Sequence, residues 1–131
     1  LHISQTLDKL RSDIAAAAQS CGRPTNAVTL LAVSKRQPVS AMRDAHAAGQ
    51  RHFGENYVQE AIDKREHLAD LEIVWHFIGP IQPNKTRDIA NAFDWVHRGL
   101  LYPFDAAADS LRYDPGWRSC LKKTMQLWRS F

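Results

Sequence analysis

The chain has 131 residues, of which 24% are charged and 44% hydrophobic, an ordinary balance for a globular protein. This length suffices for one domain with a substantial core and is short for two. No apolar run approaches the roughly 20 residues needed to cross a bilayer, and residues 1–10 lack the charged-then-apolar order of a secretory signal. Cys21 and Cys120 have no His or Cys at metal-ligand spacing, so we expect a cytosolic protein with free thiols.

The net charge of +3 is distributed unevenly. Residues 1–97 contain eleven Lys and Arg against eleven Asp and Glu, whereas residues 98–131 contain six basic residues against three acidic ones. The whole positive excess therefore belongs to the tail, and the chain divides into two unequal parts.

The first predicted elements are a helix and a buried strand. Leu7, Leu10 and Ile14 recur at helical spacing within residues 4–20, which predicts a helix with one apolar face. Residues 28–33, Val-Thr-Leu-Leu-Ala-Val, form an apolar run rich in β-formers. Such a run is typical of a strand covered on both faces, as in a parallel sheet.

Helices and strands then alternate. A second helix is expected to begin at Pro38 and to end at Gly49 through a left-handed cap. Further strands are predicted at residues 51–53, 72–78 and 94–97, and further helices at residues 57–68 and 83–93. After His97 no strand-helix unit continues the series.

This alternation indicates right-handed βαβ units and a parallel sheet. Both a doubly wound sheet and a (β/α)8 barrel fit the pattern. The sequence contains neither a G-x-G-x-x-G fingerprint nor a P-loop, which disfavours a nucleotide-binding fold.

Lys35 is the main candidate for chemistry. In parallel βα architectures, functional side chains gather at the carboxyl ends of the strands, and Lys35 stands where the apolar strand 28–33 runs out. Partial desolvation there would lower the pKa of the lysine and free its amine to form a Schiff base with a carbonyl. The alternative is a lysine that marks the end of the strand and reaches solvent.

Other polar residues near strand ends have simpler explanations. Asn56 is expected to cap the following helix, the alternative being a hydrogen bond to a ligand hydroxyl. Glu55 is expected to be a helix-start carboxylate facing the macrodipole rather than an acid or base. His76, between Trp75 and Phe77, is expected to be a hydrogen-bonded core residue rather than a ligand. Three further histidines have no metal-ligand spacing, and we expect them to lie on the surface or to pack against neighbours: His46, His52 and His67.

Three motifs occur in a familiar order and spacing. They are Leu30-Leu-Ala-Val-Ser-Lys35, then Ala48-Gly-Gln-Arg-His-Phe-Gly-Glu-Asn-Tyr-Val-Gln-Glu60, then Trp75-His-Phe-Ile-Gly79 with Asn84-Lys85. Together they resemble the pyridoxal phosphate homeostasis protein family, whose members look like the amino-terminal barrel of alanine racemase standing alone. The resemblance spans roughly residues 4–97.

The resemblance implies a single (β/α)8 barrel that binds and buffers free pyridoxal 5′-phosphate (PLP) in the cytoplasm, supports vitamin B6 balance and carries out no efficient turnover. It implies that Lys35 holds the cofactor as a Schiff base and that Asn56 lines the pocket. It also implies that His76 and Gly79 belong to a strand whose end faces the pocket. Family members are monomers, and neither a membrane nor a nucleic-acid partner is implied.

The tail departs from the family pattern. A barrel of this kind needs about 250 residues, and the family's phosphate-binding groups follow its later strands. We therefore expect residues 1–97 to form an incomplete barrel and residues 98–131 to be a divergent tail of frameshifted or truncated origin. An open sheet edge would allow self-association. Two other interpretations remain: a truncated product without activity of its own, and a module that binds nucleic acid through basic tail residues such as Lys122 and Lys123.

Overall fold

The computed structural model describes residues 2–97 and the backbone of residues 125–130. Its elements are α1 (Ile3–Ser20), β1 (Val28–Val33), α2 (Val39–Ala47), β2 (His52–Glu55), α3 (Val58–His67), β3 (Val74–Phe77), the 3-10 turn η1 (Pro83–Lys85), α4 (Thr86–Ala92), β4 (Trp95–Val96) and β5 (Met125–Ser130). The predicted order is confirmed up to β4. The ends agree within two residues, except that the first turn of the last predicted helix is the 3-10 turn.

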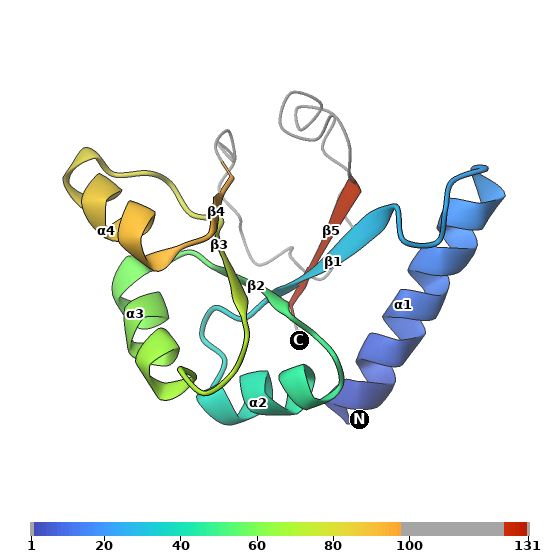
Figure 1. The fold of residues 1–131 in the computed structure, drawn as a ribbon, viewed down its shortest axis with the longest axis horizontal. Coiled ribbons are helices and arrows are strands. Elements are labelled where there is room, and N and C mark those ends of the chain that lie inside the picture. The colour runs from blue at the N-terminus through green and yellow to red at the C-terminus, as the bar shows by residue number, and fades with distance from the viewer. Residues whose placement is uncertain (1, 98–124, 131) are drawn as a thin grey trace.

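The strands form one parallel sheet in the order β4-β3-β2-β1-β5. Val33 pairs with Gly54, Gly54 with His76, and His76 with Trp95. The carboxyl ends of β1 to β4 therefore lie along one edge. Helices α1 to α4 follow one another around one side of the curved sheet (Figure 1). A parallel sheet with its helices on one side is an incomplete α/β barrel, as the resemblance predicts.

Strand β5 was not predicted from the sequence. Strand β5 pairs with β1 from Val28 opposite Met125 to Val33 opposite Ser130. It lies on the side of β1 away from β2, so it covers the edge of β1 that a four-stranded sheet would leave open. Its sequence has only weak alternation, and strand formation depends on a pairing partner as much as on pattern. The predictions for residues 98–124 lie outside the described residues.

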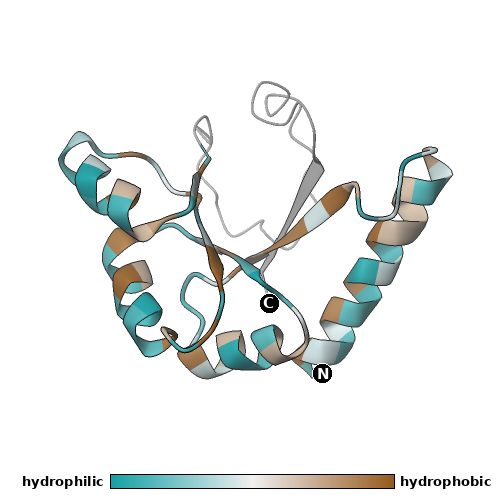
Figure 2. Ribbon diagram, in the orientation of Figure 1, coloured by the Kyte–Doolittle hydropathy of each residue, from teal (hydrophilic) through white to brown (hydrophobic). Residues whose placement is uncertain are grey.

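The two faces of the sheet have different neighbours. Successive side chains of a strand point to opposite faces, and the helices pack against one of them. Leu31, Val33 and Ile78 form a separate small cluster on the face opposite the helices. Apolar and hydrophilic residues alternate around the helices (Figure 2). The core on the helix side includes Leu7, Leu10 and Ile14 of α1, Met42 and Ala45 of α2, Ala61 of α3, Ile89 and Ala92 of α4, and Leu30, Ala32, Phe53, Trp75 and Phe77 of the strands.

Glycines follow the ends of the first two helices, as the sequence predicts for Gly49. Gly22 and Gly49 have φ angles of 69° and 93°, in the left-handed region that favours glycine. After Gly49 the chain turns back into β2 and so delivers the second strand to the sheet. Among the helices that the structure describes, none has the length and apolar character needed to cross a membrane.

Candidate functional site at the carboxyl edge of the sheet

Lys35 lies in a tight turn directly after β1. The backbone N–H of Gln37 donates to the carbonyl of Ser34 at 3.0 Å and closes the turn. Lys35 and Arg36 occupy its two central positions, and Arg36 has a φ of 60°, which a non-glycine residue adopts only at a cost. Lys35 is half-buried. The predicted location of this lysine, at the carboxyl edge where β1 ends, is confirmed.

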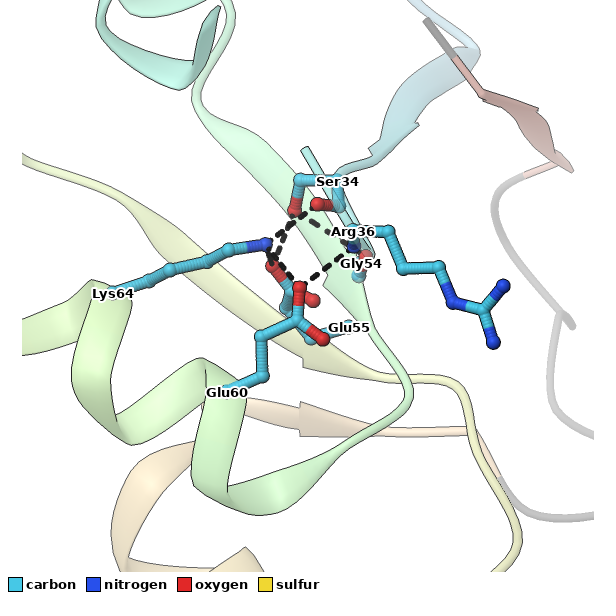
Figure 3. A network of polar contacts seen from close by, with 6 residues as sticks. All are labelled: Ser34, Arg36, Gly54, Glu55, Glu60 and Lys64. Carbon is cyan, nitrogen blue, oxygen red and sulfur yellow. Dashed lines mark hydrogen bonds and ion pairs between the residues drawn. The ribbon is translucent and has the colours of Figure 1, made fainter. Parts of the chain in front are cut away.

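A buried ion cluster lies beneath this turn (Figure 3). We call Ser34, Glu55, Glu60 and Lys64 the Lys64 cluster. The Lys64 ammonium donates to Glu55 Oε1 at 2.6 Å, to Glu60 Oε1 at 2.8 Å and to the Ser34 carbonyl at 2.7 Å. The Ser34 hydroxyl donates to Glu55 Oε1 at 2.9 Å, and the Arg36 N–H donates to Glu60 Oε1 at 2.7 Å. One ammonium thus joins the turn after β1 to the end of β2 and to α3.

The predicted role of Glu55 at the start of a helix is wrong. Glu55 is not a helix-start carboxylate but the last residue of β2, and it is fully buried. Burial raises its pKa, while the hydrogen bond and charge of Lys64 and the hydrogen bond from Ser34 oppose that rise. Sequence reasoning missed Lys64, which is 6% exposed. The available signal was Glu60 four residues before Lys64, a spacing that usually marks a pair on a solvated helix face.

Asn56 does not cap helix α3, so that expectation is also wrong. The N-cap is Tyr57, and no side chain makes a capping hydrogen bond there. Within the described part of the chain, Asn56 Oδ1 is buried without a hydrogen-bond partner. An unpaired buried polar atom costs about 1–3 kcal/mol. The amide oxygen is therefore an acceptor to which a ligand could donate.

Gly79, two residues beyond β3, packs against the backbone of Asn56. A Cβ at Gly79 would lie 2.6 Å from the Asn56 carbonyl oxygen and 3.1 Å from its Cα. Neither atom belongs to a flexible side chain, so the two loops could not both keep their positions. Glycine at this position lets the loops after β2 and β3 approach each other closely.

Gly79→Ala is expected to lower the free energy of unfolding by about 1–3 kcal/mol, because the methyl group overpacks two backbone segments. Urea denaturation measures the change. Gly54→Ala is the matched control, because its Cβ would meet the flexible Ile78 side chain at 3.3 Å. A smaller loss is expected for Gly54→Ala, and equal losses for the two variants would contradict the contact.

Three histidines form a chain across the sheet. His52 Nδ1 lies 2.9 Å from His76 Nε2, and His76 Nδ1 lies 2.9 Å from His97 Nε2. Burial lowers the pKa of His76 to about 3, with repulsion from His97 and His52 adding to it, and burial lowers that of His97 to about 4. Burial also lowers the pKa of His52. An uncharged imidazole has one N–H donor and one acceptor nitrogen, so each ring can donate a hydrogen bond to the next.

His76 is the hydrogen-bonded core residue that the sequence predicts, with 1% of its surface exposed. Its two histidine partners were not foreseen, because only the pairing of β2, β3 and β4 brings them to one place. Among the described residues, no group of three His, Cys, Asp or Glu side chains could hold a metal ion.

The predicted site residues lie at two depths. Val33, Gly54 and His76 share one level of the sheet. Lys35 and Asn56 follow two residues later on their chains, at the carboxyl edge, and Asn56 contacts Gly79 there. His76 therefore lies within the sheet, whereas Lys35, Asn56 and Gly79 lie beyond the carboxyl ends of their strands. The edge combines a half-buried amine, an unpaired amide oxygen and a close backbone approach.

Curated proteins similar to this chain share one name. The chain is 58% identical over 95 residues to the pyridoxal phosphate homeostasis protein of Pseudomonas aeruginosa, covering 72% of this chain and 41% of that protein. It is 54% identical over 99 residues to the protein of that name from Vibrio cholerae and 53% identical over 98 residues to that from Escherichia coli, covering 72% of this chain and 42% of each relative. No family model matches the chain.

The chain also superposes on solved structures. PipY of Synechococcus elongatus, solved without PLP, superposes with a TM-score of 0.55 at 50% identity, covering 64% of this chain and 40% of PipY. PipY with PLP bound gives a TM-score of 0.54 at 50% identity, over 63% of this chain and 39% of PipY. A protein of unknown function from Bifidobacterium adolescentis gives 0.64 at 28% identity, over 72% of this chain and 43% of that chain.

Fold and comparisons together define an incomplete parallel α/β barrel of the kind seen in PipY. The matched part of the chain is homologous to the pyridoxal phosphate homeostasis proteins, which confirms the resemblance drawn from the three motifs. The chain spans about two fifths of the length of the curated relatives it matches.

Proposed function

We propose that this chain binds PLP in the service of PLP homeostasis and holds it as a Schiff base on Lys35. The observation that carries the proposal is the position of Lys35, half-buried in a fixed turn at the carboxyl edge of a parallel α/β sheet. Two further facts support it: relatives at 53–58% identity are named for PLP homeostasis, and PipY has been solved with PLP bound.

The residues at the edge fit an aldehyde ligand with polar substituents. A neutral Lys35 amine would add to the aldehyde carbon, the carbonyl oxygen would leave as water, and a C=N bond would replace C=O. Asn56 Oδ1, buried and unpaired in the described part of the chain, would accept a hydrogen bond from a ligand hydroxyl. Gly79 would hold the loop after β3 against the backbone of Asn56, and His76 would support the floor of the site with a neutral ring.

The resemblance places the phosphate-binding groups after later strands, and this chain matches only about two fifths of each relative. We therefore assign Lys35 to the aldehyde of PLP and name no residue for its phosphate. We also propose that it binds without catalytic turnover and acts in the cytoplasm. The competing interpretation is a chain without activity of its own, and it predicts no selective adduct. The nucleic-acid interpretation concerns side chains outside the described residues, and no observation favours it.

The proposal predicts a selective adduct at Lys35. The full chain incubated with PLP should show a visible imine absorption band, and borohydride reduction followed by peptide mass spectrometry should locate the adduct at Lys35 several-fold above the exposed Lys85. Lys35→Ala should remove most of the band, because the amine is the attacking group. Lys85→Ala is the matched control and should keep it. Equal labelling of the two lysines would show that Lys35 has no special site.

A further inference from the structure

We propose that Glu60 and Lys64 are positioning residues that hold the Lys35 amine where it can meet an aldehyde, by fixing the turn from Ser34 to Gln37. This inference rests on the proposed function of Lys35. Neither residue is offered as a group that touches the ligand. Their role follows from three sets of contacts beneath the turn (Figure 3).

The first contact fixes the start of the turn. The Ser34 carbonyl accepts the turn-closing hydrogen bond from the Gln37 N–H at 3.0 Å, and it also accepts from the Lys64 ammonium at 2.7 Å. The Ser34 hydroxyl is bound separately to Glu55 Oε1 at 2.9 Å. The carbonyl and the hydroxyl of Ser34 are therefore held by Lys64 and Glu55, and a hydrogen bond to a charged partner is stronger than a neutral one.

The second contact fixes the residue after Lys35. Arg36 has a φ of 60°, a conformation that costs free energy for any residue with a Cβ. Its N–H donates to Glu60 Oε1 at 2.7 Å, and the same oxygen accepts from Lys64 at 2.8 Å. The carboxylate of Glu60 thus stabilises the left-handed residue while its own position is held by the ammonium.

The third feature is that regular secondary structure supports the turn from below. Glu55 lies on β2 and is fully buried, Lys64 lies on α3 and is 6% exposed, and Glu60 lies one helical turn before Lys64. The turn carrying Lys35 is therefore tied to two regular elements other than the strand it follows. Because the backbone at Lys35 is fixed in this way, only the side-chain torsions remain to be ordered when the amine reacts, which is the usual advantage of a preorganised site.

The test compares Glu60→Ala, Glu60→Gln and Glu66→Ala in the full chain, using PLP with borohydride trapping. Glu66 is the matched control, an exposed glutamate on the same helix. The readout is the ratio of the adduct on Lys35 to the adducts on the exposed Lys9 and Lys85 of the same molecule. Glu60→Ala should lower this ratio by about 10- to 100-fold, since a displacement of about 1 Å can cost about 100-fold. Glu66→Ala should leave it unchanged.

Two further measurements separate positioning from simple loss of structure. Glu60→Gln keeps an oxygen for the Arg36 N–H and should restore most of the ratio, which a general structural defect would not do. Amide hydrogen exchange should accelerate at Arg36 and Gln37 in Glu60→Ala more than elsewhere in β1 and α3. A wild-type ratio in Glu60→Ala would overturn the positioning role while leaving the Lys35 site intact. A wild-type protein without preferential labelling of Lys35 would overturn the proposed function and this inference with it.

Discussion

Lys64→Met is expected to lower the free energy of unfolding by about 3–5 kcal/mol, the usual result of removing one partner of a buried ion pair. The substitution keeps the aliphatic stem but leaves Glu55, which is fully buried, without its ammonium at 2.6 Å. It also removes the ammonium hydrogen bonds to Glu60 and Ser34. Urea denaturation at pH 8 measures the loss.

The matched control is Lys9→Met. Lys9 and Asp13 also form a pair at 2.9 Å, but both side chains are well exposed, and such pairs contribute about 0–1 kcal/mol. A Lys64→Met protein within 1 kcal/mol of wild type would show that Lys64 is not buried as described.

The same variant has a diagnostic pH dependence. Burial raises the pKa of Glu55 even with Lys64 present, and removing Lys64 takes away the interactions that oppose the rise. When the pKa of a carboxyl is higher in the folded state than in the unfolded state, the protein loses stability as the pH rises from the unfolded-state pKa to the folded-state pKa. The deficit of Lys64→Met relative to wild type should therefore be smaller at pH 5 than at pH 8. Adding Glu55→Gln to the variant should remove this difference.

Acidification should destabilise the wild-type protein through the histidine chain. His76 and His97 have folded-state pKa values of about 3 and about 4, against 6.5 for the unfolded residue. Below pH 6.5 the unfolded chain gains protons that the folded rings do not accept, so stability is present above pH 6.5 and declines as pH falls toward the folded values. Each histidine should contribute a loss of about 2 kcal/mol between pH 7.5 and pH 5.

Urea denaturation at pH 7.5 and pH 5 measures this loss, and Glu55 works in the opposite direction over part of that range. The measurement is therefore best made in a Glu55→Gln background. His97→Gln should reduce the acid sensitivity, whereas His2→Gln, at an exposed position, should leave it unchanged. Equal stability at the two pH values in the Glu55→Gln background would contradict the burial of the histidine chain.

Much of the architecture could be predicted because it depends on local pattern. The apolar run at residues 28–33 is β1, and the spacing of Leu7, Leu10 and Ile14 defines the buried face of α1. Gly49 ends α2 in the left-handed conformation expected of it. These signals are strong because periodicity and backbone restrictions act within a few residues of one another.

The cluster beneath Lys35 could not be predicted, since its members come from three elements. Glu55 and Lys64 are charged residues that a sequence pattern assigns to the surface, and each becomes buried only because the other lies within 2.6 Å. The role of Asn56 could not be predicted either. Its position suggests a helix cap, but helix α3 begins after Tyr57. Strand β5 needed β1 as a partner before its weak pattern could be recognised.

By itself, the sequence determined that Lys35 stands at the carboxyl end of a buried strand in an incomplete parallel α/β barrel, because hydrophobic periodicity and three ordered motifs are properties of the chain. Only the tertiary structure decided what holds that lysine in place. A charged cluster of Ser34, Glu55, Glu60 and Lys64 forms when β1, β2 and α3 pack together. The physical reason is desolvation: a buried charge is tolerated only where a partner from another element compensates it, and the sequence does not reveal that pairing.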